Sequence, residues 1–458
     1  MRAAELASRR VAVWGLGREG RAAIGMLRKE HPSLPLLVLD DAAGGRPPEG
    51  AGSNIDYAFG ADAIARAIEN IDVIVKSPGV SLYRREIRSA REKGIKVTSL
   101  LNLWFAEPIT ITTICVTGTK GKSTTASLVA HILQNLGRRV ALVGNIGIPI
   151  TELDCAAADI AVIEVSSYQA ADFRGTCDVA VLTSLYPEHL DWHLTVENYF
   201  RDKINLVSRG KYRIISAETA HTVERLADNT GACQYRFNDD SRIHARGTRI
   251  FDGPNLIGEV RNAYLARSHN LSNLCAGLGV ARSLGIDAEA ALGAAEGFRG
   301  LPHRQQELGV VDGVLFVDDS ISTIPESTAA ALAAYAGRDI AVIVGGYDRG
   351  IEYRELVEAT VGGAARALIC LGQSGRRIYC LAREIAARGQ RICAIRQANS
   401  MKEAVLLARR AIPPGGVVLL SPAAPSYGDY RDYIERGRDF AAHAGIGAFG
   451  CDVSHSDR

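Results

Sequence analysis

Short apolar runs alternate along the chain with longer segments in which apolar residues recur every three or four positions. An uninterrupted run of roughly four to eight apolar residues is typical of a strand buried on both faces, whereas the longer spacing is typical of an amphipathic helix. Buried strands that alternate with helices form parallel sheets with crossover connections. The pattern therefore predicts an α/β fold of mostly parallel sheets with flanking helices.

The predicted strands fall into three blocks, which agrees with a chain of 458 residues being too long for one ordinary core. We predict one domain for each block, with boundaries at residues 1–106, 107–300 and 301–458. The segments that carry the predicted strands are 9–29, 36–41, 72–80, 109–116, 139–147, 159–169, 178–185, 315–320, 340–346, 367–372 and 417–428.

The first block opens with a strand, a glycine turn and a helix. Gly15, Gly17 and Gly20 have the spacing of a dinucleotide-binding turn, and Asp40 or Asp41 after the second strand suits a ribose hydroxyl. A tight turn without a ligand would have the same sequence. The block predicts a Rossmann-like fold and leaves open whether a nucleotide binds there.

Composition excludes several classes of function. Lys and Arg number 53 against 51 Asp and Glu, and a net charge of +2 gives no electrostatic footprint for nucleic acid. The nine cysteines contain no C-x-x-C pair, which favours reduced, mostly buried thiols over a disulfide framework or a zinc site. The sequence lacks a signal-peptide pattern and any apolar stretch long enough to span a membrane. We expect a cytoplasmic protein that acts on a small molecule.

The segment VTGTKGKSTT, residues 116–125, lies between a predicted strand and a predicted helix. Gly118 and Gly121 predict a turn whose backbone N–H groups converge on an anion at the N-terminus of the helix. Lys122 can reach the outer phosphates of a nucleotide, and the hydroxyls of Ser123 and Thr124 can contact Mg²⁺. The segment predicts a phosphate-binding loop, two residues shorter than the common G-x-x-x-x-G-K-[ST] form.

Two other segments carry polar residues that could bind a metal. Glu164 ends an apolar strand, where a lone carboxylate needs a partner; Mg²⁺ or a neighbouring base would serve. His189 and His193 are four residues apart, which suits zinc if they share a helix face. No third ligand or H-E-x-x-H pattern accompanies them, so a zinc site is not established by this spacing, and we expect His193 to have a structural role or to support a ligand from behind.

The short loop resembles the ATP loop of the Mur ligase family, the ATP-dependent amide-forming enzymes of peptidoglycan assembly, and of their folylpolyglutamate synthase relatives. Further segments resemble that family in the same order along the chain, and they are VGNIG, YPEHLDWH, NYFRDKINLV, SHNLSNLCA, LPHRQQE and VDDSIST. The resemblance therefore covers all three blocks.

The resemblance implies roles for individual residues. The implied ATP contacts are Gly118, Thr119, Lys120, Gly121, Lys122, Ser123, Thr124, Asn270, Asn273, Arg304 and Asp319. The implied magnesium ligands are Ser123, Glu164, His189 and Lys203, with Lys203 carbamylated, and the implied catalytic residues are Lys122, His189 and Lys203. From the residues alone, Lys120 equally suits a solvated loop lysine, and Lys203 is expected to be an exposed helix lysine. The two asparagines equally suit helix caps.

Within the family, GLGREG, KSPGV and SPAAPSYGDYRDYIERGRDF resemble the glutamate-adding members. This implies that the first domain holds the UDP part of UDP-N-acetylmuramoyl-L-alanine, the central domain ATP, and the C-terminal domain the amino acid. Ser77, Pro78 and Gly79 are then expected at the uridine, and Asn145 and His189 near the muramoyl arm.

The expected glutamate pocket departs from the pattern of D-glutamate-adding enzymes. Ile321 and Arg349 stand where lysines are usual, and Tyr433 stands where Phe is usual. An arginine binds a carboxylate through two parallel hydrogen bonds, whereas a lysine is a point charge. The altered pocket, together with WGLGREGRAA near the start of the chain, resembles the less common subgroup that adds L-glutamate. The resemblance therefore implies L-glutamate, with D-glutamate as the alternative, and a pocket that includes Thr323, Arg349, Ser426 and Tyr433.

The expected reaction is the ligation of glutamate to UDP-N-acetylmuramoyl-L-alanine through an acyl phosphate, with ATP and Mg²⁺. His189 is a candidate base for the incoming amine. We expect a monomer with no nucleic-acid partner and no membrane insertion. The alternatives are another Mur ligase or a folylpolyglutamate synthase, a nicotinamide dehydrogenase built on the first glycine turn, and a non-catalytic ATP-binding regulator.

Overall fold

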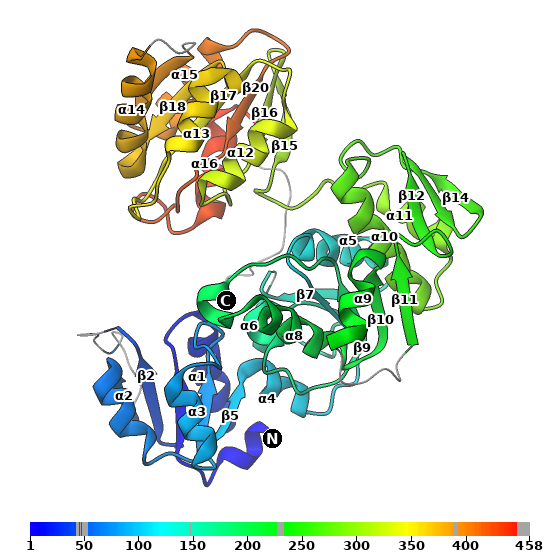
Figure 1. The fold of residues 1–458 in the computed structure, drawn as a ribbon, viewed down its shortest axis with the longest axis vertical. Coiled ribbons are helices and arrows are strands. Elements are labelled where there is room, and N and C mark those ends of the chain that lie inside the picture. The colour runs from blue at the N-terminus through cyan, green and yellow to red at the C-terminus, as the bar shows by residue number, and fades with distance from the viewer. Residues whose placement is uncertain are drawn as a thin grey trace. The chain divides into compact units, whose positions relative to one another are not determined.

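A computed structural model describes residues 1–42, 45, 47, 54–146, 148–226, 233–388 and 393–446. They form two compact units, Met1–Phe298 and Arg299–Arg458 (Figure 1). The first unit contains three sheets and the second contains one, and most strand pairs are parallel. The predicted α/β class is confirmed.

The first sheet has five parallel strands in the order β3-β2-β1-β4-β5. Its strands are β1 (Val11–Trp14), β2 (Leu36–Asp40), β3 (Ile55–Phe59), β4 (Val73–Lys76) and β5 (Lys96–Ser99). Its helices are the 3₁₀ helix η1 (Ala3–Leu6), α1 (Arg18–Glu30), α2 (Ala61–Ile68), α3 (Arg85–Glu92) and α4 (Leu100–Ala106). Trp14 pairs with both Leu39 and Lys76, so β1, β2 and β4 end together at one edge of the sheet.

The second sheet has six parallel strands in the order β11-β10-β9-β6-β8-β7. Its strands are β6 (Thr112–Thr117), β7 (Val140–Gly144), β8 (Ile160–Glu164), β9 (Cys177–Leu182), β10 (Gly210–Ser216) and β11 (Cys233–Phe237). The helices of this region are α5 (Lys122–Asn135), η2 (Ile150–Glu152), α6 (Ser167–Ala170), α7 (Leu190–His193), α8 (Val196–Val207), α9 (Ala217–Leu226), α10 (Ser268–Ser283) and α11 (Ala288–Ala295). The central strand β6 lies between β8 and β9, and it leads directly into the predicted phosphate loop.

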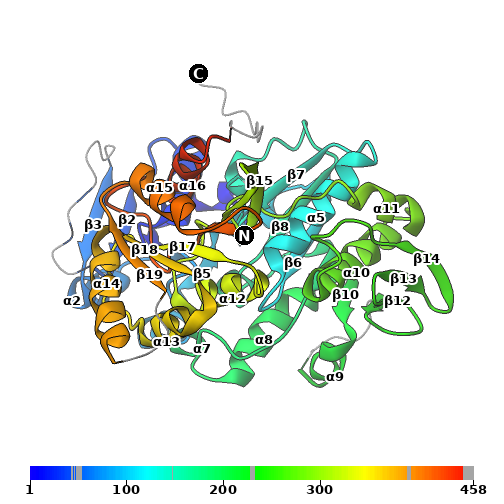
Figure 2. The same ribbon diagram turned by 90° about the horizontal axis from the view of Figure 1, so that it is seen from above.

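A small antiparallel sheet that the sequence analysis did not predict lies beside α10 and α11 (Figure 2). Its strands are β12 (Ile243–Arg246), β13 (Arg249–Asp252) and β14 (Asn255–Glu259). Ile243 and Ile250 are fully buried in the same hydrophobic cluster as α5 and α10, so this sheet extends the core of the second sheet.

The first and second sheets share a hydrophobic core. Leu103 of α4 and Leu27 of α1 belong to one buried cluster with Ile163 of β8 and Phe173. Phe105 packs edge-on against Phe173, with ring centroids 4.8 Å apart. Burying a large apolar side chain contributes roughly 1.5–3 kcal/mol, so this shared cluster holds the two predicted domains together as one compact unit.

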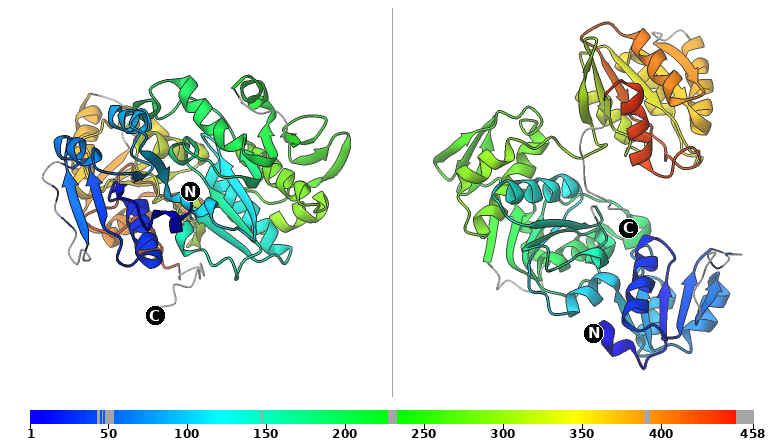
Figure 3. Two further views of the ribbon diagram at one scale, coloured as in Figure 1. Left: turned by 90° about the horizontal axis from the view of Figure 1, so that it is seen from below. Right: turned by 180° about the vertical axis from the view of Figure 1, so that it is seen from behind.

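The sheet of the second unit has the strand order β15-β16-β20-β17-β18-β19, with β15 antiparallel to its neighbour. Its strands are β15 (Gln306–Val311), β16 (Val314–Asp318), β17 (Ile340–Val344), β18 (Ala367–Leu371), β19 (Ala394–Ala398) and β20 (Val417–Leu420). Its helices are α12 (Pro325–Ala334), α13 (Arg354–Ala359), the π turn η3 (Thr360–Ala364), α14 (Gly372–Ala387), α15 (Met401–Ala411) and α16 (Tyr433–His443). Two separate hydrophobic clusters cover the two faces of the sheet, one under α12, α13 and α14 and the other under α15 and α16. Figure 3 shows the helices of this unit around its sheet.

Five of the seven described thiols are buried and free, which agrees with the predicted reduced cysteines; the side chain of Cys233 and the whole of Cys451 lie outside the described residues. Among the helices of the described segments, none has the length and apolar character needed to cross a membrane.

Candidate active site

The predicted phosphate loop is a tight turn between β6 and α5. Gly118 and Gly121 have φ values of +145° and +83°, which disfavour residues with a side chain. A Cβ atom at Gly118 would collide with the Thr183 hydroxyl, and one at Gly121 would collide with the Asn273 side-chain oxygen. Both glycines are therefore required by backbone conformation and by close packing.

The two lysines of the loop have different surroundings. Lys122 Nζ donates a hydrogen bond to the carbonyl oxygen of Thr119 at 2.9 Å, so its ammonium group lies against the loop itself. Lys120 Nζ forms an ion pair with Glu188 at 2.7 Å, and its side chain is 71% exposed. The surroundings of Lys122 fit the predicted phosphate contact, whereas Lys120 is a mostly solvated lysine with one carboxylate partner.

The backbone N–H groups of the loop are only partly free. Those of Thr119 and Lys120 donate to Ser184, at 2.8 and 2.9 Å. The first turn of α5 has no side-chain cap, and such a turn leaves N–H groups without intrahelical partners. The predicted hydroxyl ligands lie in this turn, with Ser123 partly exposed and Thr124 buried. An anion therefore fits best at the N-terminus of α5.

Lys203 of α8 is buried beneath this turn. Its Nζ donates to the carbonyl oxygen of Gly118 at 2.7 Å and lies 4.9 Å from the centre of the Tyr199 ring. Burial lowers the pKa of Lys203 well below its usual value, and the positive charge of Lys122 lowers it further. The alternative of an exposed helix lysine is wrong, because only 1% of Lys203 is exposed.

Glu164 at the end of β8 is 1% exposed. Its Oε1 accepts a hydrogen bond from Asn145 Nδ2 at 3.1 Å, while its Oε2 has no hydrogen-bond partner among the described residues. No lysine, arginine or histidine forms an ion pair with it in the described part of the chain, although Lys203 lies close enough for the charge of Glu164 to raise its pKa. A buried carboxylate oxygen without a donor suits a cation.

A cavity of about 250 Å³ adjoins the loop. Five of the predicted site residues line it, and they are Pro78, Lys122, Asn145, His189 and Lys203. His189 is the N-cap residue before α7 and has a φ of +55°, and its ring lies 5.1 Å from the ring of Tyr168. Burial lowers the pKa of His189, which favours its neutral, metal-binding form. The cavity is lined by Glu19, Pro78, Lys122, Asn145, Ser166, Ser167, Tyr168, Glu188, His189, Tyr199 and Lys203.

Glu19 is a cavity residue that the sequence analysis missed. It lies in the first turn of α1, and Gln169 of the second sheet's region donates a hydrogen bond to its carboxylate. Burial raises the pKa of Glu19 to about 7, against the opposing effect of Lys76. No local motif marks this residue, since its position depends on packing between two sheets.

A second feature that the sequence analysis missed is a buried hydrogen-bond chain. His193 Nδ1 lies 2.6 Å from Asp202 Oδ2, and His193 Nε2 lies 3.0 Å from the hydroxyl of Ser167. Tyr83 OH donates to the same aspartate at 3.0 Å. Because both ring nitrogens of His193 are engaged, the alternative of zinc between His189 and His193 is wrong. This series of hydrogen bonds holds the Ser167 hydroxyl at the wall of the cavity.

Replacing His193 with alanine is expected to lower the free energy of unfolding by about 2–4 kcal/mol, because it leaves Asp202 and Ser167 buried without their common partner. Urea unfolding monitored by circular dichroism measures the change. His221→Ala, at an exposed position on α9, is the matched control and should be nearly neutral. A His193→Ala variant as stable as that control would contradict a stabilising role for the hydrogen bonds of His193.

Asn270 and Asn273 lie inside α10 and not at its cap, which is Arg267, so the helix-cap alternative is wrong. Asn270 Nδ2 donates to the carbonyl oxygen of Tyr264 at 2.9 Å, and Asn273 Nδ2 donates to Asn270 Oδ1 at 3.2 Å. The hydroxyl of Thr125 donates to Asn273 at 3.2 Å. Asn273 thus connects α10 to the phosphate loop, and Asn270 accepts a hydrogen bond from Asn273. The contact of both asparagines with ATP stays a prediction.

The predicted uridine residues follow β4, at the same sheet edge as the first glycine turn. The Ser77 hydroxyl donates to the carbonyl oxygen of Gly15 at 2.9 Å, which ties the two turns together. The carbonyl oxygen of Pro78 accepts a hydrogen bond from the indole of Trp192 at 3.0 Å, and Gly79 is exposed. This edge of the first sheet therefore reaches the 189–203 segment.

The two candidate ribose aspartates already have partners. Asp40 Oδ2 accepts a hydrogen bond from the backbone N–H of Leu16 at 2.9 Å, and Asp41 pairs with Arg84 at 2.7 Å. Asp40 stabilises the glycine turn, which supports the alternative of a turn residue.

In the second unit, Asp319 is the centre of a polar network. Its carboxylate accepts hydrogen bonds from the backbone N–H of Gln305 at 3.1 Å and from the hydroxyls of Ser322 and Ser421 at 2.5 and 2.7 Å. Burial raises the pKa of Asp319 to about 6. Arg304 is exposed and lies close enough to influence that pKa.

The structure brings two of the four predicted glutamate-pocket residues into contact. Arg349 Nη2 donates to the carbonyl oxygen of Thr323 at 2.9 Å. Tyr433, at the start of α16, packs against His303 with ring centroids 5.8 Å apart. Ser426 is buried, and its carbonyl oxygen accepts from the backbone of the following turn. These positions leave the pocket assignment a prediction.

The chain is similar in sequence to known enzymes over almost its whole length. Two family models match it, the Mur ligase middle domain at residues 116–281 and the Mur ligase glutamate ligase domain at residues 303–424. A relative from Xanthomonas axonopodis pv. citri (strain 306), named UDP-N-acetylmuramoyl-L-alanine--L-glutamate ligase, is 40% identical over 97% of this chain and 97% of its own length. A relative of the same name from Xylella fastidiosa (strain Temecula1 / ATCC 700964) is 38% identical over 97% of each chain.

Solved structures share the fold at low sequence identity. MurF from Acinetobacter baumannii has a TM-score of 0.58 and 16% identity, covering 95% of this chain and 90% of that chain. UDP-N-acetylmuramate-alanine ligase MurC from Thermotoga maritima has a TM-score of 0.54 and 18% identity, covering 95% and 99%. With family models over its central and C-terminal parts and near full-length relatives, the chain belongs to the Mur ligase family.

Proposed function

We propose that this enzyme ligates L-glutamate to UDP-N-acetylmuramoyl-L-alanine, with ATP converted to ADP and phosphate, in peptidoglycan precursor synthesis in the cytoplasm. The proposal rests on near full-length similarity to relatives that carry this name. The structural observation that supports it best is the short glycine turn, with Lys122 above it and Lys203 buried beneath it.

The residues around the turn suit ATP and Mg²⁺. The first turn of α5 and Lys122 would hold the phosphates, and Ser123, Glu164, His189 and a carbamylated Lys203 would hold magnesium. The unpartnered Oε2 of Glu164 supports this assignment. Bound magnesium would neutralise charge that develops on the phosphate oxygens.

The chemistry begins with two anions, because the carboxylate of the UDP substrate attacks the γ-phosphate of ATP. Lys122 reduces the repulsion between them and stabilises charge on the transferring group. The attack forms an acyl phosphate and releases ADP, and the glutamate amine then displaces phosphate to give the amide. The cavity beside the loop offers the substrate its contacts with Asn145 and His189.

A neutral amine at Lys203 is the form that reacts with CO₂ to give a carbamate. Because its pKa is depressed in this structure, Lys203 supplies that form more readily than a solvated lysine. The carbamate would reverse the charge at this position from positive to negative, and it would provide oxygen ligands for a hard cation.

His189 is the candidate base for the glutamate ammonium group. Its lowered pKa keeps the imidazole neutral near pH 7. It cannot at once bind a cation and accept a proton through the same nitrogen, so these two predicted roles require different nitrogens or different steps.

The decisive experiment measures ADP release with UDP-N-acetylmuramoyl-L-alanine and, separately, pure L- and D-glutamate. We expect kcat/KM for L-glutamate to exceed that for D-glutamate at least about tenfold, equivalent to one lost charged contact. Mass spectrometry of the product provides the control that an amide forms. Equal or faster turnover of D-glutamate would contradict the proposed enantiomer, and turnover only with alanine or a diamino acid would contradict the proposed substrate.

A further inference from the structure

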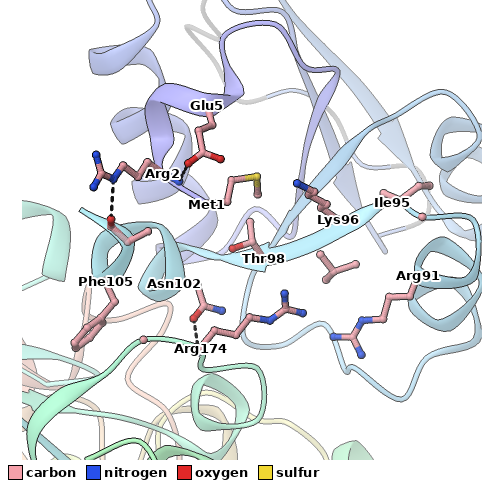
Figure 4. A pocket seen from close by; sticks show the side chains of 14 residues that line it. Met1, Arg2, Glu5, Arg91, Ile95, Lys96, Thr98, Asn102, Phe105 and Arg174 are labelled. Atoms are coloured by element: carbon pink, nitrogen blue, oxygen red, sulfur yellow. Dashed lines mark hydrogen bonds between the residues drawn. The ribbon is translucent and has the colours of Figure 1, made fainter. Parts of the chain in front are cut away.

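A cavity of about 700 Å³ lies along the edge strand β5, and it shares no lining residue with the cavity beside the phosphate loop (Figure 4). It is formed by η1, the end of α3, β5, α4 and the segment that follows Phe173. Nothing in the proposed ligation uses these residues. The cavity is therefore a separate feature of the first unit.

The charges that line this cavity are mostly of one sign. Arg2, Lys96, Arg91 and Arg174 contribute four positive charges, and Glu5 contributes one negative charge. The carboxylate of Glu5 already accepts a hydrogen bond from the backbone N–H of Arg2 at 3.1 Å. The lining side chains thus have an excess of three positive charges, on a chain whose formal net charge is only +2.

Two of these arginines face each other. The side chains of Arg91 and Arg174 point toward one another from opposite sides of the cavity (Figure 4). Burial lowers the pKa of Arg91, and the positive charge of Arg174 lowers it further. Neither guanidinium forms an ion pair or hydrogen bond with another described residue. The nearby carboxylate of Asp172 is fully buried and pairs with Lys76 at 3.5 Å.

The position of Arg174 is fixed by the wall of the cavity. Its backbone N–H donates to Asn102 Oδ1 at 2.8 Å, and Asn102 Nδ2 donates to the carbonyl oxygen of Asp172 at 2.8 Å. Asn102 is itself buried. Arg91 therefore lies on helix α3, and Arg174 lies on a segment whose backbone is held by hydrogen bonds to Asn102.

Both arginines are exposed, and the nearby carboxylates of Glu5 and Asp172 form no ion pair with either guanidinium group. The two guanidinium groups repel each other, and an anion between them would reduce that repulsion. Guanidinium groups match the geometry of phosphate and carboxylate oxygens through paired hydrogen bonds. We propose that this cavity binds a small multivalent oxyanion, a di- or triphosphate or a tricarboxylate, between Arg91 and Arg174. This site does not depend on the proposed ligase activity.

Calorimetric titration with pyrophosphate and with citrate tests the site. To weaken anion binding at the phosphate loop, the titrations use Lys122→Ala as the background for every variant. Adding Arg91→Ala together with Arg174→Ala is expected to weaken binding by about tenfold or more, since each guanidinium donates charge-assisted hydrogen bonds. The matched control is Arg88→Ala, an exposed arginine on the same helix α3 that does not line the cavity. Equal affinity of the double variant and the control would overturn the proposal.

A site-resolved measurement on the unmutated enzyme avoids any dependence on variants that fail to fold. Phenylglyoxal modifies accessible arginines, and mass spectrometry locates the modified residues. Pyrophosphate or citrate is expected to protect Arg91 and Arg174 but not Arg88, with protection that weakens as ionic strength rises. The more protective probe identifies phosphate or carboxylate as the preferred chemistry. Protection of all three arginines to the same extent, or of none, would overturn the proposal.

Discussion

Lys122→Ala is expected to lower kcat for glutamate-dependent ADP release by about 10²–10³-fold, the usual effect of removing one group that stabilises transition-state charge. The reason is that Lys122 lies against the glycine turn, with its ammonium group at the carbonyl oxygen of Thr119. Binding of UDP-N-acetylmuramoyl-L-alanine should change little. Coupled ADP detection measures the first quantity, and calorimetry measures the second.

Two further variants sharpen this test. Lys122→Arg keeps the charge but changes its shape, so it should recover only part of the activity. Lys29→Ala removes an exposed lysine of α1 and should leave kcat unchanged. Undiminished turnover by Lys122→Ala would reject the phosphate loop as the ATP site.

Lys203→Ala is the second variant with a large expected effect, a fall in kcat of about 10²–10³-fold through loss of a negatively charged ligand. Added formate or acetate should restore part of the activity by supplying the missing carboxylate oxygens. The same acids should not rescue Lys122→Ala, which makes that variant the control for specificity. Activity of Lys203→Ala that these acids leave unchanged would count against a carbamate.

A measurement without turnover complements the rescue. Enzyme equilibrated with ¹³C-labelled CO₂ should give a carbamate carbon signal that Lys203→Ala lacks. Because the carbamate forms from the neutral amine, the signal should increase as pH rises through the depressed pKa of Lys203. An identical signal from both proteins would place the carbamate elsewhere.

Sequence patterns predicted the fold class because several strands beside the site are apolar runs that end at a polar residue, such as Ile160–Glu164. They did not predict the antiparallel sheet at Ile243–Glu259. Its three strands are four or five residues long, and polar residues occupy many of their positions. Short, half-exposed strands give a weak signal, and their pairing depends on the helices that they pack against.

The site shows a similar division. The loop from Gly118 to Lys122 could be predicted because its residues are adjacent in sequence and their spacing is set by one turn. The contact between His193 and Ser167 could not, because 26 residues separate them and no local pattern specifies that pairing. The residues around Lys203 did not predict its burial for the same reason. That burial depends on how α8 packs under the loop, which no local pattern specifies.

The core that the first two sheets share limits where this chain can be joined to a related chain in a chimera. A chimera joined at residue 106 would separate Phe105 from the Phe173 it packs against, and would require two halves that evolved together. A junction at residue 298 cuts between the compact units instead. Recombination within this lineage should therefore transmit residues 1–298 as one inherited block.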